Sequence, residues 1–188
     1  VILEDGTYYL TKTLVFKPEN SGTEKYPVTW QAANDGKAII SGGQLLDPDW
    51  KPFRDGIYKA KMNDDVIIDQ LYIDGQRQRM ARFPNAVEGK NVFDTWELIH
   101  TREPDPDNDP LDPERIASWE NPEGAYVHAM HMALWGDMHW QVTGRNQDGS
   151  LQMEGGWQNN RPSPMHPRYR MVENVFEELD VPGEWYFD

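Results

Sequence analysis

The chain has 188 residues, which is enough for one domain or two small units. Its 32 acidic residues outnumber its 18 lysines and arginines, and the resulting net charge of -14 repels phosphate backbones and anionic membrane surfaces. The absence of cysteine excludes disulfides and thiolate metal sites, and no apolar run approaches the ~20 residues that a membrane-spanning helix needs. We therefore expect neither a nucleic-acid partner nor a membrane span.

The composition predicts an all-β fold. The chain contains 15 glycines, 14 prolines, 8 tryptophans and 8 tyrosines, and it has few stretches that suit an amphipathic helix. A mean hydropathy of -0.80 would fit a disordered chain, but aromatic residues make up 12% of the sequence and are spread along it. We therefore expect many short strands joined by tight turns.

The first 73 residues alternate short β-branched or aromatic runs with turn signals. The runs are 7–10, 14–16, 28–30, 38–40 and 66–68, and the turns contain Gly6, Asn20-Ser21-Gly22, Asn34-Asp35-Gly36 and Gly42-Gly43. The runs 14–16 and 38–40 start 24 residues apart, which fits one three-sided coil of a β-solenoid. An antiparallel sandwich gives similar spacings, so the period alone leaves both architectures open.

The character of the sequence changes after Asn85. The acidic stretch 102–114 contains four prolines and is predicted to be a loop. A long strand is predicted over 124–135, and the runs 140–143 and 150–153 predict a hairpin because Asp148-Gly149 lies between them. Helical spacing of apolar residues predicts one short helix over 170–179, which ends before Pro182-Gly183.

Several segments in order resemble secreted bacterial right-handed parallel β-helix proteins of carbohydrate-active, pectate-lyase-like type. They are 6–10, 41–43, 71–85, Glu173-Asn174 and 182–186, so the resemblance spans nearly the whole chain. Several groups among these proteins are glycoside hydrolases.

The resemblance implies an all-β architecture with three parts. These are the first coils of a right-handed parallel β-helix over 1–73, an inserted antiparallel β-subdomain over 74–180 with the acidic loop 102–114, and the start of a return to the β-helix over 181–188. It also implies a secreted, periplasmic or cell-surface protein of which this chain is only the N-terminal part. The catalytic carboxylates of such families usually lie on later coils, and we expect them beyond residue 188.

Glycoside hydrolysis needs two carboxyl groups that flank the scissile bond. The acidic residues near the C-terminus are Glu177, Glu178, Asp180 and Glu184. In a chain with 32 acidic residues such a cluster arises by chance, so we expect these groups to be structural or solvated. Glu184 alone is kept as a candidate catalytic residue, because a rigid Pro-Gly turn and Trp185 adjoin it.

The sequence predicts no metal site and no cofactor. Asp105, Asp107 and Asp109 alternate like the first ligands of a calcium loop, but Pro110 and Ile116 occupy positions that require Gly and Glu. His128, His131 and His139 suggest a transition metal, yet His128 and His131 point to opposite faces of an extended strand. We therefore expect chelation to leave stability unchanged.

The candidate substrate-binding residues combine aromatic and polar side chains. Flat sugar faces pack on aromatic rings, while amide, imidazole and guanidinium groups bond to hydroxyls. The set is Trp135, His139, Trp140, Trp157, Asn160, Arg161 and His166. The alternative is that the tryptophans fill a small core, although 157–162 is predicted to be an exposed loop. Arg77, Arg79 and Arg82 are expected to form a basic edge against the acidic loop.

Three functions are weighed for this chain. The first is the N-terminal part of a β-helix glycoside hydrolase, in which the inserted subdomain forms one wall of the cleft for a polysaccharide or oligosaccharide. The alternative is a non-catalytic glycan-binding or adhesin-like β-helix segment. A polysaccharide lyase is disfavoured because no convincing calcium-dependent or basic constellation is present. The expected partners are carbohydrate and the remainder of the same polypeptide.

Overall fold

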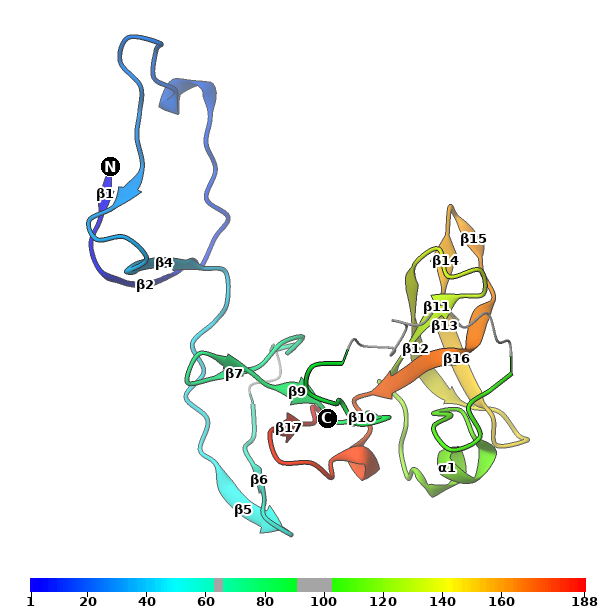
Figure 1. Cartoon of the computed structure of the whole chain (residues 1–188). Helices are drawn as coiled ribbons and strands as arrows, with labels where there is room; N and C mark the ends of the chain where they lie inside the picture. The colour runs from blue at the N-terminus through cyan, green and yellow to red at the C-terminus, as the bar shows by residue number, and fades with distance from the viewer. Residues whose placement is uncertain (63–65, 91–102) are drawn as a thin grey trace. The chain divides into compact units, whose positions relative to one another are not determined.

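The computed structural model describes residues 1–62, 66–90 and 103–188 (Figure 1). The chain divides into two compact units, Val1–Val66 (unit 1) and Ile67–Asp188 (unit 2). The elements are almost all β-strands, as the composition predicts, with one short α-helix and two 3-10 helices among the described residues. Within these residues no helix has the length and apolar character needed to span a membrane.

Unit 1 consists of two-stranded ladders. Its elements are β1 (Ile2–Leu3), β2 (Gly6–Tyr9), the 3-10 helix η1 (Pro18–Asn20), β3 (Gln31–Ala32), β4 (Ala38–Ser41), β5 (Lys51–Arg54) and β6 (Ile57–Lys59). Strands β1 and β3 are parallel, as are β2 and β4, whereas β5 and β6 form an antiparallel hairpin. Parallel pairing of short strands is what stacked coils require, but these ladders are small and mixed in direction.

The predicted 24-residue coil spacing is wrong. The run 38–40 is a strand, but its parallel partner is β2, with Gly6 opposite Ala38, and the predicted strands at 14–16, 28–30 and 66–68 do not form. Phe16 instead packs its ring edge-on against Trp30, with the ring centroids 5.3 Å apart. Local β-propensity cannot choose a partner strand, and an extended run without a partner is no strand.

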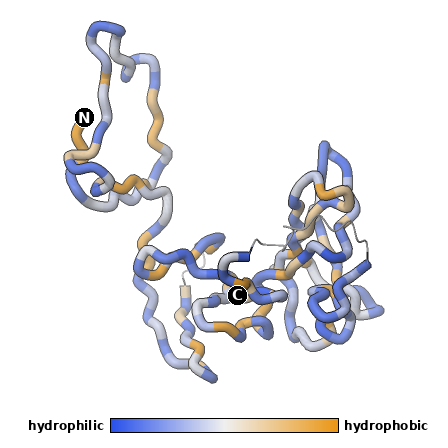
Figure 2. The backbone as a smooth tube through the Cα atoms, in the orientation of Figure 1, coloured by the Kyte–Doolittle hydropathy of each residue, from blue (hydrophilic) through white to orange (hydrophobic). Residues whose placement is uncertain are grey.

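No described residue of unit 1 is buried. Several of its apolar side chains are exposed. Ile2, Val15, Phe16, Tyr26, Val28, Ile39, Ile40 and Leu45 all keep more than two fifths of their surface exposed. Figure 2 colours the chain by hydropathy and shows hydrophobic segments along unit 1 in orange. Exposed apolar surface of this kind is typical of regions that another surface covers.

Unit 2 begins with short pairs and continues into a five-stranded antiparallel sheet with the order β10-β16-β11-β12-β13 (Figure 1). The first elements are β7 (Tyr72–Ile73), β8 (Gln76–Arg77), β9 (Arg79–Met80), β10 (Arg82–Phe83) and α1 (Pro113–Ser118). The others are β11 (Tyr126–His131), β12 (Asp137–Arg145), β13 (Leu151–Gly155), β14 (Trp157–Gln158), β15 (Arg161–Pro162), β16 (Met165–Glu173), the 3-10 helix η2 (Phe176–Glu178) and β17 (Glu184–Trp185).

The core of unit 2 lies on one face of this sheet. Val127, Val142 and Val172, from three different strands, are at most 1% exposed, and Ile116 and Trp119 reach them from α1 and the residue after it. Helix α1 starts at a defined point because the Asp112 carboxylate accepts the amide hydrogens of Glu114 and Arg115, while Pro113 suits the first turn.

The C-terminal strand β17 pairs with β9, a strand about a hundred residues earlier in the sequence. Strand β17 runs parallel to β9, with Glu184 opposite Arg79 and Trp185 opposite Met80. The five-stranded sheet is therefore formed by chain that lies between the two strands of one parallel pair. The domain boundaries at residues 73 and 180 stay predictions.

The hairpin predicted from Asp148-Gly149 is confirmed, because β12 pairs antiparallel with β13. The strand predicted over 124–135 is shorter and ends at His131. The helix predicted over 170–179 is wrong: β16 continues to Glu173 and only the three residues of η2 are helical. Val172 pairs with Val127 on one side and Phe83 on the other, and this pairing outweighs the local helical spacing.

Candidate functional site

Two exposed tryptophan-bearing turns lie at the same end of the antiparallel sheet. The turn 132–136 joins β11 to β12, and the segment 156–164 joins β13 to β16. The backbone amide of Met132 donates to the carbonyl oxygen of Pro164 at 3.2 Å. The backbone amide of Ser163 donates to the carbonyl oxygen of Gly156 at 2.9 Å. We call 132–136 and 156–164 the tryptophan end.

Trp135 presents most of its ring to solvent, with 72% of its surface exposed. One face stacks on His131, with ring centroids 5.0 Å apart and an angle of 10° between the rings. His131 is held in turn, because its Nδ1 accepts the amide hydrogen of Ala133 at 2.9 Å. The indole is thus oriented while remaining available to a flat ligand.

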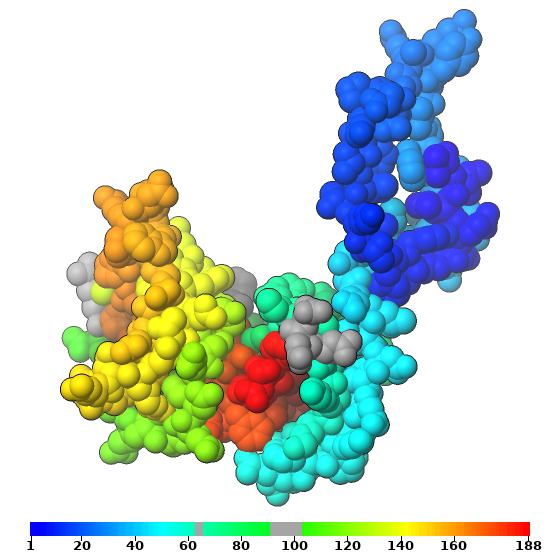
Figure 3. Space-filling model, turned by 180° about the vertical axis from the view of Figure 1, so that it is seen from behind, coloured from blue at the N-terminus to red at the C-terminus, as the bar shows by residue number. Residues whose placement is uncertain are grey.

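Trp157 projects from a two-residue hairpin (orange in Figure 3) and is 65% exposed. The turn residues Asn159 and Asn160 have φ of 51° and 60°, a conformation that asparagine tolerates better than most residues. Asn160 and Arg161 are exposed on the same hairpin, with Arg161 opposite Gln158 in the ladder. The predicted loop is therefore a tight β14–β15 hairpin that carries an indole, an amide and a guanidinium group.

Two of the predicted substrate-binding residues lie inside the unit. Trp140 is partly buried against the core, with its indole directly under Gly156. His166 is 2% exposed, and its Nδ1 accepts the amide hydrogens of Arg168 and Tyr169. These positions favour packing roles for both residues.

His139 belongs to a polar row on the sheet face opposite the core. It lies directly across from His128, with the ring centroids 4.4 Å apart, and its Nε2 is 3.1 Å from a carboxylate oxygen of Asp137. On the other side of β11, Nε2 of His128 is 2.9 Å from a carboxylate oxygen of Glu173. The row crosses three neighbouring strands, β12, β11 and β16.

Opposing effects act on the Glu173 carboxylate. Burial by itself raises its pKa, but the hydrogen bond from His128 and the charges of His128, Arg82 and Arg77 outweigh burial and leave the pKa below its usual value. Arg82 is 5% exposed and lies opposite Glu173 in the ladder between β10 and β16. Glu173 is therefore held as an anion within the sheet.

The acidic residues near the C-terminus each have a partner within the protein. Glu178 is buried, binds Arg115 through both carboxylate oxygens at 2.9 and 3.0 Å, and accepts the indole hydrogen of Trp119 at 2.8 Å. Glu177 accepts the amide hydrogen of Glu120, and Asp180 accepts an amide hydrogen of Asn85.

Glu184 is half-buried and closes the turn before β17. Its carboxylate accepts the amide hydrogens of Asp180 and Val181 at 3.4 and 3.3 Å. Burial raises the pKa of Glu184, and the charge of Asp180 adds to the rise, while the backbone hydrogen bonds oppose it. A raised pKa suits a general acid, but a catalytic role for Glu184 stays a prediction.

The described part of the acidic loop, 103–114, pairs with β16. Arg170 binds both carboxylate oxygens of Asp109 at 2.8 and 2.6 Å, and Arg168 lies 3.5 Å from Asp105. The sequence predicts that Arg77, Arg79 and Arg82 face this loop. The arginines that pair with Asp105 and Asp109 belong to β16 instead. Folding of the chain brings the loop next to β16, although β16 is more distant in sequence. Arg102 lies outside the described residues.

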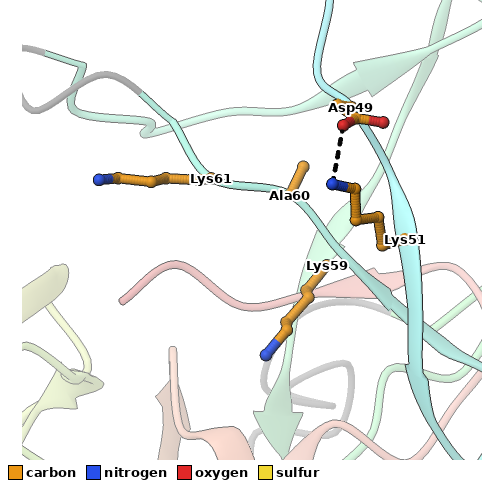
Figure 4. Close-up of a pocket in the computed structure, with 5 residues that line it drawn as sticks. All are labelled: Asp49, Lys51, Lys59, Ala60 and Lys61. Atoms are coloured by element: carbon orange, nitrogen blue, oxygen red, sulfur yellow. Dashed lines mark ion pairs between the residues drawn. The ribbon is translucent and has the colours of Figure 1, made fainter.

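A separate open cavity of about 410 Å³ lies beside the β5–β6 hairpin of unit 1 (Figure 4). It is lined by Asp49, Lys51, Lys59, Ala60 and Lys61. Lys51 pairs with Asp49 at 3.0 Å, whereas the ammonium groups of Lys59 and Lys61 point in different directions. The three lysines do not converge on one point, so this cavity is not built to hold an anion.

Comparison with known proteins identifies a likeness of fold. A solved structure described as "Glycoside hydrolase" matches 100% of this chain with a TM-score of 0.69 at 23% sequence identity. The chain spans 33% of the length of that protein. No family model matches the sequence, and no curated protein matches it either. Unit 1 and unit 2 thus have a glycoside-hydrolase-like all-β fold.

The polar row was not found by sequence reasoning. The sequence places His128 and His131 on opposite faces of one strand. In the structure His131 stacks on Trp135 and does not join the row. The partner that matters, His139, comes from the next strand, and Glu173 comes from a segment that was expected to be helical. The sequence feature that could have revealed the row is a pair of histidine-bearing strands, 126–131 and 137–145, joined by a short turn.

Proposed function

We propose that this chain is the N-terminal part of a β-helix glycoside hydrolase that acts on a polysaccharide or oligosaccharide. The observation that carries the proposal is the likeness of the whole chain to one third of a glycoside hydrolase. The parallel ladders β1–β3, β2–β4 and β9–β17 support it, because they are the pairing from which stacked coils are built.

In this proposal the tryptophan end forms one wall of the substrate cleft. Trp135 and Trp157 are both exposed, and Trp135 is held by its stacking on His131. Asn160 and Arg161 supply exposed polar groups on the same β14–β15 hairpin as Trp157. The acid and base that cleave the bond are contributed by coils beyond residue 188. The acidic residues near the C-terminus support this view, because Glu177, Glu178 and Asp180 are engaged in structural contacts.

The proposal is tested with two polypeptides, the 188-residue chain and the longer natural polypeptide that contains it. Both are incubated with a panel of neutral and acidic plant and host glycans, and released reducing ends are measured. We expect turnover by the longer polypeptide only. Turnover by the 188-residue chain would contradict the placement of the catalytic carboxylates.

A second candidate is a non-catalytic, glycan-binding or adhesin-like β-helix segment. The exposure of two tryptophans at one end of the sheet favours it, since binding needs no acid and base. Oligosaccharides are titrated against the intrinsic fluorescence of the chain, with Trp157→Ala as the test variant and Trp50→Ala, an exposed tryptophan of unit 1, as the control. Binding that only Trp157→Ala weakens, together with no turnover by the longer polypeptide, favours this candidate.

A further inference from the structure

We propose that His128, Asp137 and His139 form a binding site for a divalent transition-metal ion of the zinc class. Each residue offers one ligand atom, and these nitrogen and oxygen atoms all lie within 4.8 Å of one another. The site is independent of the proposed hydrolase function, because metal binding is read out directly. The sequence predicts no metal site, and this proposal departs from that prediction.

Strand register brings the three ligands together. Asp137 and His139 are two residues apart on β12 and therefore point to the same face, and His128 lies directly opposite His139 on β11. All three positions belong to the paired part of the sheet, with Met130 opposite Asp137. Rigid strands hold metal ligands more accurately than loops do.

One of the three distances between ligand atoms already matches metal geometry, and the others, at most 4.8 Å, can close by side-chain rotation. Two ligand atoms on a tetrahedral zinc ion lie about 3.3 Å apart when each is about 2.0 to 2.1 Å from the metal. Nε2 of His139 and the nearer oxygen of Asp137 are already 3.1 Å apart. The side chains of Asp137 and His139 are 45% and 60% exposed, so both have room to rotate toward His128.

Glu173 supplies an outer carboxylate partner for His128. A histidine that binds a metal through one ring nitrogen commonly donates the N–H of the other ring nitrogen to a carboxylate. This hydrogen bond fixes the tautomer and the ring orientation. Glu173 approaches Nε2 of His128 at 2.9 Å from β16, the strand on the other side of β11. This hydrogen bond leaves Nδ1 of His128 with its lone pair.

The donor set selects the class of metal. Two imidazoles and one carboxylate suit zinc and its neighbours among the first-row divalent ions, whereas calcium and magnesium prefer oxygen ligands alone. Three protein ligands leave one tetrahedral position open. A water molecule or a sugar hydroxyl fits that position chemically.

The test measures zinc binding by the 188-residue chain after dialysis against a chelator. Isothermal titration with zinc chloride is expected to give one equivalent bound with a micromolar or tighter Kd. His128→Ala, Asp137→Ala and His139→Ala should each weaken binding by about tenfold or more. His131→Ala, which removes a histidine held outside the group by Trp135, should bind like wild type.

Far-UV circular dichroism checks that each variant is folded, and Asp137→Asn replaces the alanine variant where that one unfolds. Glu173→Gln should retain one equivalent of zinc with about tenfold weaker affinity. An unchanged affinity in Glu173→Gln would overturn the role of the outer partner. A Kd above about 1 mM, or an equal loss in His131→Ala, would overturn the site and leave an ordinary histidine–carboxylate contact.

Discussion

Glu178 is the residue that ties helix α1 to the C-terminal part of unit 2. Its carboxylate is buried between the guanidinium group of Arg115 and the indole of Trp119, and it accepts hydrogen bonds from both. Glu178→Ala should lower the free energy of unfolding by about 3 kcal/mol, because it leaves an arginine and an indole N–H without their acceptor. Urea unfolding followed by tryptophan fluorescence measures the change.

The matched control for Glu178→Ala is Glu120→Ala, because Glu120 is also acidic and close in space to this region but exposed. Within the described part of the chain, its recorded contact is made by the backbone amide, which donates to Glu177. Its removal should change the free energy of unfolding by less than about 0.5 kcal/mol. Equal losses in the two variants would mean that the Glu178 contacts do not stabilise the unit.

Glu184 predicts a dependence of stability on pH. Because burial raises its pKa in the folded protein, its contribution to stability is complete below the ordinary value of 4.5 and is lost as the pH rises through the folded pKa. Glu184→Gln removes this titration while keeping an oxygen that accepts the amide hydrogens of Asp180 and Val181.

We therefore expect the stability of Glu184→Gln relative to wild type to increase as the pH rises from 4 toward neutrality, and then to level off. Urea midpoints of both proteins at a series of pH values measure this difference. A difference that stays constant over the series would show that Glu184 titrates as a fully solvated carboxylate.

At the scale of elements, Gly156 separates β13 from the β14–β15 hairpin and lies directly against the indole of Trp140 in β12. A Cβ atom at Gly156 would overlap the indole of Trp140, and the residue has φ of +65°. Gly156→Ala should cost about 3 kcal/mol through overpacking and backbone strain. Thermal or urea unfolding of the variant measures the loss.

Gly149→Ala separates the two contributions. Gly149 also has a positive φ, +87°, but a Cβ atom there would meet nothing within 4 Å. Its substitution should cost only the backbone strain, about 1 kcal/mol. A similar loss in both variants would mean that the indole of Trp140 moves aside at little cost.

The elements that could be predicted from the sequence are those with local signals. Asp148-Gly149 between two strand-like runs predicts the β12–β13 hairpin, because the turn residues themselves require that conformation. The helix over 170–179 was wrong, since Val172 is paired on both sides by residues that are distant in sequence. The partner of β4 was wrong for the same reason.

The candidate site divides in the same way. Exposure of Trp157 could be predicted from the amide-rich turn beside it, whereas the burial of His166 depends on backbone contacts within β16, a strand that was not expected there. The row of His139, His128 and Glu173 depends on the register of three strands. Register is a property of the assembled sheet and has no local sequence signal.

At the scale of the whole molecule, burial is distributed unevenly between the two units. The described residues of unit 1 include no buried side chain, whereas unit 2 has a core around Val127, Val142 and Val172. Apolar burial is the main source of folding free energy, so nearly all of the stability of the 188-residue chain should come from unit 2.

Limited proteolysis of the 188-residue chain should therefore cut within unit 1 and leave a resistant fragment that starts near residue 67. A chain of residues 67–188 alone should unfold at the same urea concentration as the complete chain, because unit 1 adds little buried surface. Hydrogen exchange should be slow at Val127 and Val142 and fast at Tyr8 and Ile39. The proposed function adds further coils to this chain. If those coils cover Ile39 and Ile40, exchange in β4 should be slower in the longer polypeptide and the cleavage should disappear. Resistance of unit 1 in the 188-residue chain would show that its exposed apolar residues need no such cover.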